Sequence, residues 1–150
     1  MKARLNYMEV APNAIKGMLE LENFVHTSGL ERSLYELVKT RASQINGCAY
    51  CLDMHTKDAR KAGETEQRLY ALNAWRETPF YTERERAALA WAEALTLISE
   101  NDVPDSLYEA TRQHFSEEEI VALTMAIVAI NGWNRLAISF RSVPGSYKTQ

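Results

Sequence analysis

Two cysteines and a histidine, spaced for chemistry, lie within one short stretch of the sequence. Cys48 and Cys51 are the only cysteines of the chain. Two thiols at C-x-x-C spacing can close and reopen a small disulfide ring, which is the minimum equipment for two-electron redox chemistry. His55 follows four residues after the second thiol, and on a helix this spacing places it one turn away on the same face. We therefore predict an active site here, with a base or hydrogen-bond donor beside a nucleophilic thiol.

The elements that must position these residues are predicted to be two helices joined by a turn. Ser28-Gly-Leu-Glu31 fits a capping box that opens the first helix. Asn46-Gly47 tolerates a left-handed backbone and predicts its end. The second helix is expected to begin near Cys48 and to end at Gly63, so that the unpaired amides of its first turn would favour both thiolates. The apolar stripe of the first helix consists of Leu30, Leu34, Leu37, Val38 and Ile45.

Glu36 lies opposite that apolar stripe, on a face that also carries Thr40 and Ser43 and leads towards Cys48. Such small polar neighbours would leave room for water or a substrate. On these residues alone a solvated glutamate is the simpler interpretation. Ten helical residues span about 15 Å, so Glu36 reaches His55 only if the two helices cross suitably.

Apolar residues recur at helical spacing along nearly the whole chain, and no segment alternates long enough to predict a sheet. With no repeat or linker in the sequence, we expect one domain over residues 1–150, an all-α compact bundle of about seven to eight helices. Further helices are predicted from Pro12 to Val25, from Thr65 to Trp75, from a capping box at Thr82 to Ile98, after Asp102-Val-Pro104, from a capping box at Ser116 through Ile120–Ile130, and around Trp133–Phe140.

The composition argues against a nucleic-acid-binding protein and against a membrane protein. The chain is 46% hydrophobic and 25% charged with a net charge of -3, which gives no basic surface for nucleic acid or for a membrane. The N-terminal residues lack the apolar core of a signal peptide, and the apolar run Ile120–Ile130 is shorter than a bilayer span. We expect a soluble, cytoplasmic protein. Because Ile120–Ile130 is apolar nearly all round, it is predicted to be buried on all sides, within the bundle or against another subunit.

Two simpler interpretations of the cysteines compete with redox chemistry. The pair could be buried and inert, or it could bind a structural zinc with His55 as third ligand. The fourth ligand would then come from His26, His114 or a carboxylate, because no second C-x-x-C or C-x-x-H follows. Neither histidine suggests another function, and Trp75, Trp91 and Trp133 fall at core spacing.

One motif consists of Glu36, eleven further residues and then Cys48-Ala-Tyr-Cys51-Leu-Asp-Met-His55. This motif resembles the E-x11-C-x-x-C-x-x-x-H signature of AhpD-like alkylhydroperoxidases. These proteins belong to the carboxymuconolactone decarboxylase superfamily, which is all-helical and oligomeric. The segments SQINGCAYCLDMH, WRETPFYTERERAAL and NGWNRLAI are also similar to that family, so the resemblance covers most of the chain.

The resemblance implies a role for each residue of the motif. Cys51 would attack the peroxide, Cys48 would resolve the product, and Glu36 and His55 would form the proton relay. Where the founding AhpD proteins have a second histidine between the cysteines, this chain has Tyr50. A phenol with a pKa of ~10 is a poor base near neutral pH, so Tyr50 is a secondary candidate and the relay is expected to be weaker or differently arranged.

The activity so implied is that of a thiol-dependent peroxidase or disulfide reductase in antioxidant defence. Its substrate would be a hydroperoxide, an external dithiol would return the electrons, and no metal or other cofactor would be needed. The family also implies a homo-oligomer, a trimer or hexamer. Two alternatives are a cofactor-free decarboxylase-type enzyme on the same fold and a non-enzymatic helical oligomer with a structural disulfide or zinc.

Overall fold

The computed structural model describes residues 1–149, and these residues form helices without any strand, as expected for an all-α protein. In chain order the helices are α1 (Tyr7–Val10), α2 (Pro12–Thr27), α3 (Arg32–Asn46), α4 (Ala49–Lys61), α5 (Glu66–Tyr70), the 3-10 helix η1 (Leu72–Glu77), α6 (Glu83–Thr96), α7 (Asp105–Arg112) and α8 (Glu117–Phe140). This is the AhpD-like fold that the sequence predicts.

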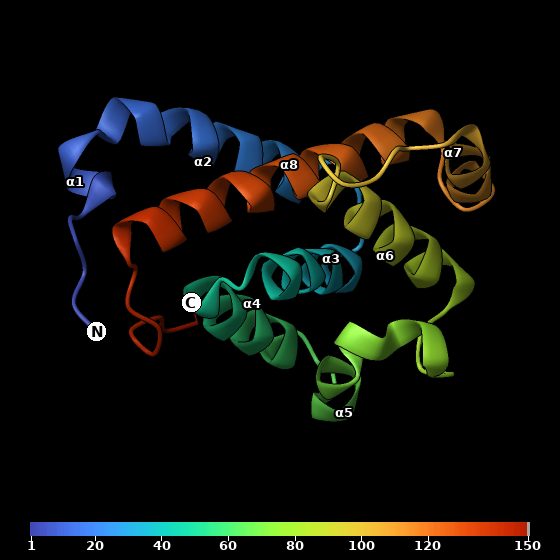
Figure 1. The fold of residues 1–150 in the computed structure, drawn as a ribbon, viewed down its shortest axis with the longest axis horizontal. Coiled ribbons are helices and arrows are strands. Elements are labelled where there is room, and N and C mark those ends of the chain that lie inside the picture. The colour runs from blue at the N-terminus through green and yellow to red at the C-terminus, as the bar shows by residue number, and fades with distance from the viewer. Residues whose placement is uncertain (150) are drawn as a thin grey trace.

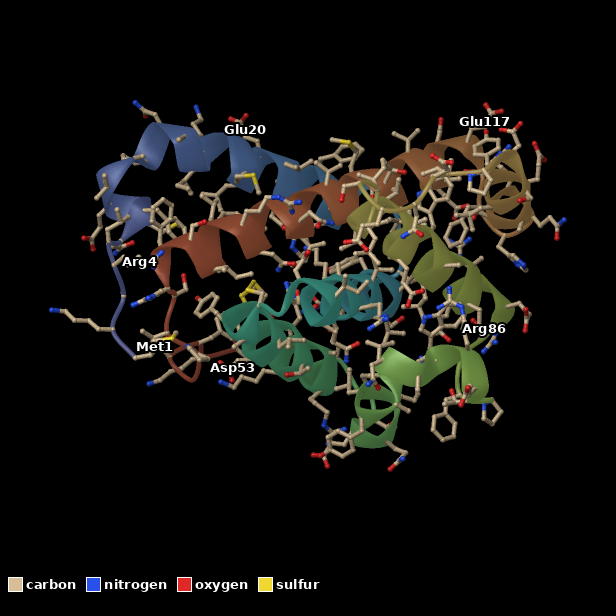
Figure 2. All side chains as sticks on the ribbon, viewed as in Figure 1. Met1, Arg4, Glu20, Asp53, Arg86 and Glu117 are labelled. Atoms are coloured by element: carbon tan, nitrogen blue, oxygen red, sulfur yellow. A yellow bond between two sulfur atoms is a disulfide. The ribbon has the colours of Figure 1, made fainter. Side chains whose placement is uncertain are left out.

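The centre of the bundle is α3, which packs against α4, α6 and α8. Figure 1 shows α2 lying along α8 on one side of α3, with α4 and α5 on the other side. Side chains fill the spaces between these helices, and Figure 2 shows the sulfur pair between the start of α4 and α8. Cys48 and Cys51 are there part of a small buried cluster with Ala42, Ile130 and Ala137.

Most predicted helix starts are confirmed, because they depend on local side-chain chemistry. Thr82 and Ser116 both form complete capping boxes, at α6 and α8. The predicted capping box at Ser28 is wrong. The Ser28 hydroxyl instead donates to the Val25 carbonyl (2.8 Å) at the end of α2, and α3 begins at Arg32 without a side-chain cap.

Other differences arise from contacts between helices. The helix expected over residues 65–75 is divided into α5 and η1, with a non-helical backbone at Ala74. The two helices predicted on either side of residue 131 are one continuous α8. Asn131 lies within this helix, and its side-chain amide donates to the Ile127 carbonyl (2.9 Å) and to the Thr96 hydroxyl (3.2 Å). Gly132 lets α2 pass closely, since a Cβ there would lie 2.8 Å from Cε of Met18.

The prediction that the apolar part of α8 is buried on all sides is confirmed within this chain for one face, and burial of the other face against another subunit stays a prediction. Ile127 and Ile130 are almost fully buried, but Val121 and Val128 are 57% and 49% exposed. By length and composition α8 could cross a membrane, yet half of its most apolar window is buried inside the protein. This is the behaviour of a core helix, so the apolar sequence of α8 is weak evidence for a membrane span.

Candidate active site

A tight turn between α3 and α4 sets the geometry of the motif. Gly47 adopts a left-handed conformation (φ 68°) that ends α3, which is a conformation that glycine adopts at no steric cost. The Cys48 N–H then donates to the Ser43 carbonyl (3.0 Å), and Cys48 becomes the N-cap of α4. The two helices run back along one another, so the end of α3 faces the start of α4.

Across this hairpin, Glu36 and His55 form a buried pair. Nδ1 of His55 lies 2.9 Å from Oε2 of Glu36, and the residues are only 5% and 3% exposed. The helices therefore do cross suitably, and the interpretation of Glu36 as a solvated residue is wrong. Because an ionised carboxylate only accepts hydrogen bonds, Nδ1 carries a proton in this pair.

The other ring nitrogen of His55 is buried without a partner among the described residues. Buried polar atoms are nearly always hydrogen-bonded, so an exception calls for an explanation. With Nδ1 protonated, a neutral ring presents its lone pair at Nε2. His55 is thus arranged as a base whose orientation is fixed by Glu36.

The two cysteines are joined by a disulfide at the start of α4, with their Cα atoms 5.4 Å apart. Each residue is 1% exposed, and the Cys51 N–H donates to Sγ of Cys48 (3.4 Å). A disulfide sulfur is not a thiolate ligand, so in this state the pair cannot bind zinc as the alternative interpretation requires.

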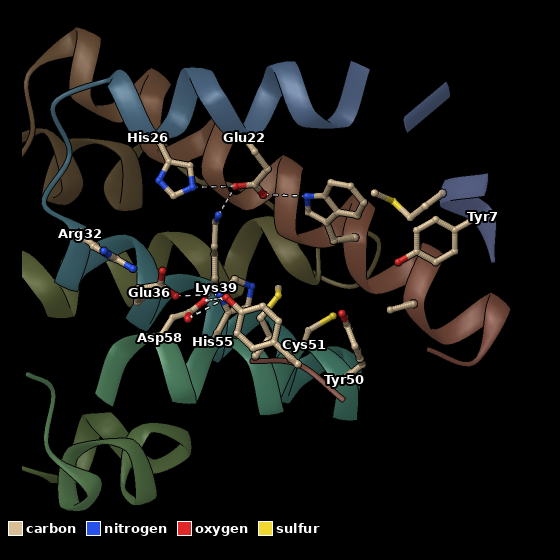
Figure 3. Close-up of a pocket in the computed structure, with 15 residues that line it drawn as sticks. Tyr7, Glu22, His26, Arg32, Glu36, Lys39, Tyr50, Cys51, His55 and Asp58 are labelled. Carbon is tan, nitrogen blue, oxygen red and sulfur yellow. Dashed lines mark hydrogen bonds and ion pairs between the residues drawn. The ribbon is translucent and has the colours of Figure 1, made fainter. Parts of the chain in front are cut away.

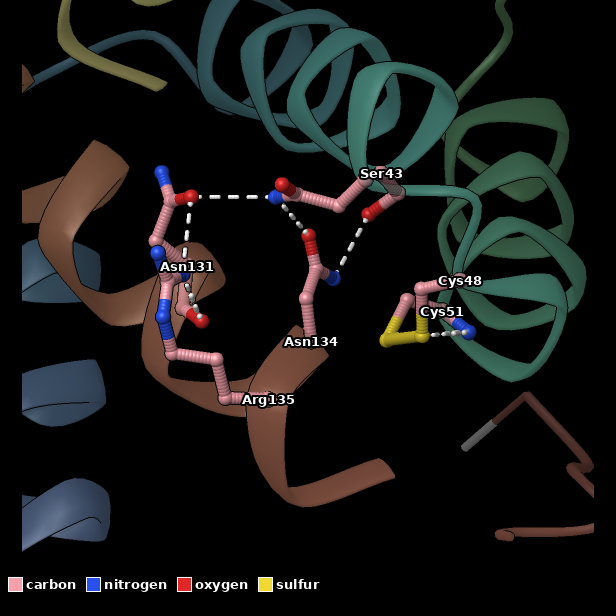
Figure 4. The surroundings of a disulfide bond; sticks show 7 residues. Ser43, Cys48, Cys51, Asn131, Asn134 and Arg135 are labelled. Carbon is pink, nitrogen blue, oxygen red and sulfur yellow. Dashed lines mark hydrogen bonds between the residues drawn. A yellow bond between two sulfur atoms is a disulfide. The ribbon is translucent and has the colours of Figure 1, made fainter. Parts of the chain in front are cut away.

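A buried amide network holds the turn against α8 (Figure 4). Oδ1 of Asn134, which is 1% exposed, accepts from Nδ2 of Asn46 (2.8 Å), and its Nδ2 donates to the Ser43 hydroxyl (3.1 Å). Satisfied buried networks of this kind make a structure rigid. Asn134 therefore connects α8 to the last turn of α3, next to the disulfide.

A cavity of about 460 Å³ opens beside these groups (Figure 3). Cys51 lines it together with Glu36 and His55, whereas Cys48 does not. Of the two cysteines, Cys51 is therefore the one that lies at the cavity. The other residues of the wall are Tyr7, Met8, Glu22, His26, Arg32, Lys39, Tyr50, Met54, Asp58, Trp133, Ala137 and Tyr147.

Two phenols stand at this cavity. Burial raises the pKa of Tyr50 above its ordinary value, which makes it a still weaker replacement for a histidine base. Tyr147 comes from the C-terminal segment, and its hydroxyl donates to Asp58 (2.9 Å). Burial, together with that hydrogen bond, raises the pKa of Tyr147 to about 12, so this phenol is neutral at physiological pH.

Several residues of the wall were not predicted as site residues. Lys39 is 2% exposed, and its ammonium donates to Oε2 of Glu22 on α2. Oε1 of the same carboxylate accepts from Nε1 of Trp133 (2.9 Å), and His26 lies nearby, with Nε2 3.8 Å from Glu22. The one signal in the sequence was the position of Lys39 three residues after Glu36, which places both on one face of α3.

One group of side chains in the described part of the chain could hold a cation. Glu36, His55 and Asp58 offer ligand atoms within 4.8 Å of one another. Nδ1 of His55 already donates to Glu36, so a metal bound through that nitrogen would have to displace the proton of the pair.

Residues 12–94 match the model of the Carboxymuconolactone decarboxylase family. The chain belongs to this family. It is 50% identical over 139 residues to YdfG of Bacillus subtilis, an uncharacterized protein, which covers 93% of this chain and 95% of that one. It also superposes with a TM-score of 0.93 on a protein of unknown function from Agrobacterium tumefaciens, described as a candidate antioxidant defence protein AhpD. That protein is 51% identical, and the match covers 97% of this chain and all of the other.

A shorter match reaches a family member with a named activity. The alkyl hydroperoxide reductase AhpD of Mycobacteroides abscessus is 45% identical over 51 residues, which is 33% of this chain and 29% of that protein. The AhpD-like identity of the fold is thus shown over the whole chain, while the likeness to this reductase covers a third of it.

Proposed function

We propose that this family member is a thiol peroxidase that reduces hydroperoxides at Cys51 in antioxidant defence. The observation that carries the proposal is the orphaned Nε2 of His55, one helical turn from Cys51 in the same cavity and oriented from behind by Glu36. A buried, oriented base next to a thiol is what nucleophilic sulfur chemistry requires.

The reaction begins with the reduced cysteine pair. Nε2 of His55 takes the proton of the Cys51 thiol, and Glu36 stabilises the imidazolium that results. The thiolate attacks the terminal oxygen of the hydroperoxide R–O–OH, so the S–O bond forms as the O–O bond breaks. Sulfur is oxidised to a sulfenic acid, and the departing alkoxide takes the proton from His55 to leave as an alcohol.

Cys48 then resolves the intermediate. Its thiol attacks the sulfur of the Cys51 sulfenic acid and water leaves, which gives the disulfide between Cys48 and Cys51. An external dithiol returns two electrons by thiol–disulfide exchange, which restores both thiols and oxidises the donor. The opposite exchange, in which the reduced pair passes its electrons to the disulfide of another molecule, would make the protein a disulfide reductase. The cycle needs no metal or other cofactor.

Single-cysteine variants test the assignment of the two thiols. Cys48→Ser is expected to consume about one equivalent of peroxide and to trap a sulfenic acid on Cys51, since resolution is blocked. Cys51→Ser is expected to be inert. Stopped-flow peroxide consumption, with mass spectrometry of the trapped residue, measures both. An inert Cys48→Ser beside a Cys51→Ser as fast as the parent would reverse the assignment.

Thiol titration distinguishes the proposed function from its alternatives. The reduced parent should lose both free thiols on adding one equivalent of peroxide, and a dithiol should restore them. The peptide that spans Cys48 and Cys51 should become lighter by two hydrogens on oxidation. A decarboxylase-type enzyme would leave the thiols unchanged, and a zinc protein would release stoichiometric metal as they oxidise.

A further inference from the structure

The reaction as derived makes no use of the buried ion pair in the cavity wall. Lys39 is among the largest fully buried side chains of the protein, at 2% exposure, and it pairs with Glu22. Burying an ion pair costs desolvation free energy that the attraction between the charges barely offsets, and an apolar pair of equal size is often as stable. Stability therefore does not explain a lysine at this position.

The hairpin places Lys39 at the level of the reacting sulfur. Lys39 lies three residues beyond Glu36 in the direction of the turn, and Cys51 lies four residues before His55, also towards the turn. Since Glu36 and His55 meet across the hairpin, the next turns of the two helices bring Lys39 and Cys51 to the same depth of the cavity. Both residues line it.

The ammonium of Lys39 also has a donor to spare. It carries three N–H groups. Within the described residues it donates one hydrogen bond, to Glu22, and it also lies over the ring of Tyr35, 5.2 Å from the centroid. Figure 3 shows the lysine side chain reaching across the cavity to Glu22 on α2. Glu22 is in turn fixed by the indole N–H of Trp133. The ammonium is thus held in place between Glu22 and the Tyr35 ring, with one N–H left for a ligand in the cavity.

We infer that Lys39 is a further catalytic residue, which donates a hydrogen bond to the oxygen that leaves when the O–O bond breaks. In the attack of Cys51, negative charge moves from sulfur to the alkoxide oxygen R–O⁻, which then takes its proton from His55. A cation fixed beside that oxygen, in a site shielded from water, stabilises the transition state. The inference rests on the proposed peroxidase function and adds the group that stabilises its leaving oxygen.

The basicity of the leaving group provides the test. In the Cys48→Ser background, Lys39→Met should slow the first turnover with tert-butyl hydroperoxide by roughly 10²-fold, as loss of a fixed charge donor does elsewhere. Peracetic acid releases a carboxylate, a far weaker base than an alkoxide, so its rate should stay close to that of the parent. Alkylation of Cys51 by iodoacetamide, which breaks no O–O bond, should not change.

Two further variants control for damage to the fold. Lys39→Met/Glu22→Gln removes the carboxylate charge that Lys39→Met leaves buried, and it should show the same selective loss. Arg41→Met breaks a different ion pair of α3, to Glu93, away from the cavity, and it should react like the Cys48→Ser background with every reagent.

The outcomes separate this inference from the proposed function. Equal slowing with both peroxides, or slowing of iodoacetamide alkylation to the same degree, would assign Lys39 to the thiolate or to the fold and overturn the inference. An unchanged rate with tert-butyl hydroperoxide would also overturn it while leaving the peroxidase function intact. Failure of the Cys48→Ser background itself to consume either peroxide would refute the peroxidase function, and the inference with it.

Discussion

The carboxylate of Glu36 offers the sharpest test of the proton relay, because a nearly isosteric change removes only its charge. In Glu36→Gln the amide oxygen can still accept from Nδ1 of His55, so the ring should keep its orientation. What is lost is the negative charge 2.9 Å from that nitrogen. The imidazolium that forms when Cys51 gives up its proton then loses its counter-charge.

The size of the effect follows from burial. Both side chains are more than nine-tenths buried, so water screens the pair little. A hydrogen bond to a charged group contributes ~1.5–3 kcal/mol, against ~0.5–1.5 kcal/mol for a neutral one. The difference between the midpoints of these ranges is about 1.25 kcal/mol, which is a factor of about eight in the population of the thiolate–imidazolium pair. Since the thiolate is the reacting species, the single-turnover rate should fall by about that factor near neutral pH, where the internal proton transfer supplies the thiolate. The rate should recover at high pH, where the thiol ionises without the help of His55.

The assay is single-turnover peroxide consumption by stopped flow between pH 5 and 10, in the Cys48→Ser background. Glu93→Gln is the matched control, because Glu93 is a partly buried carboxylate in an ion pair remote from the cavity. It should leave the profile in place. A Glu36→Gln profile that superposes on that of the background would refute a charged relay and reduce Glu36 to a packing role.

Three more expectations follow from features around the site. Asn134→Leu leaves Asn46 and Ser43 without their buried hydrogen-bond partner, so the free energy of unfolding should fall by about 2 kcal/mol. A thermal melt followed by circular dichroism should show Tm lowered by about 6 °C, and an unchanged Tm would contradict this. Tyr147 has a pKa raised to about 12, so its stabilising contribution is complete below pH ~10 and is lost as the pH rises through about 12. The gap in free energy of unfolding between parent and Tyr147→Phe, measured by urea titration, should close over that range and would be constant if the phenol played no part. Light scattering should give the mass of a closed homo-oligomer at micromolar concentration, and a monomeric parent would refute this assembly. If the exposed face of α8 is the interface, Val121→Glu/Val128→Glu should reduce the measured mass.

Local chemistry made much of the architecture predictable. The left-handed end of α3 at Gly47, the helix start at Cys48 and the capping box at Ser116 follow from residues within a few positions of each feature. The resemblance to the AhpD-like proteins added the link from Glu36 to His55, which periodicity alone could not provide. Their contact depends on how two helices cross, and no sequence pattern specifies a crossing angle.

The site residues that the sequence did not predict were missed because their contacts join distant parts of the chain. A lysine is among the residue types least often fully buried, so the sequence favours a solvated Lys39. Its burial depends on the ion pair with Glu22 on α2, which is distant in the sequence. The contact between Tyr147 and Asp58 joins positions 89 residues apart. The contact of Met18 with Gly132 likewise joins distant parts of the chain, and the end of the Met18 side chain packs where a Cβ would have stood.

One consequence of the hairpin concerns how such a protein can change over evolution. The groups proposed to move protons and electrons, from Glu36 to His55, lie on 20 consecutive residues, and their mutual contacts are local in sequence. The cavity in front of them is closed by α1, α2, α8 and the C-terminal segment. Substitutions in Met8 or Tyr147 can therefore alter the shape and polarity of the entrance while Glu36, His55 and the cysteines keep their mutual contacts. Under the proposed mechanism, the motif is encoded in one short part of the gene and much of the entrance in others, so drift in the entrance can change selectivity without disturbing the motif.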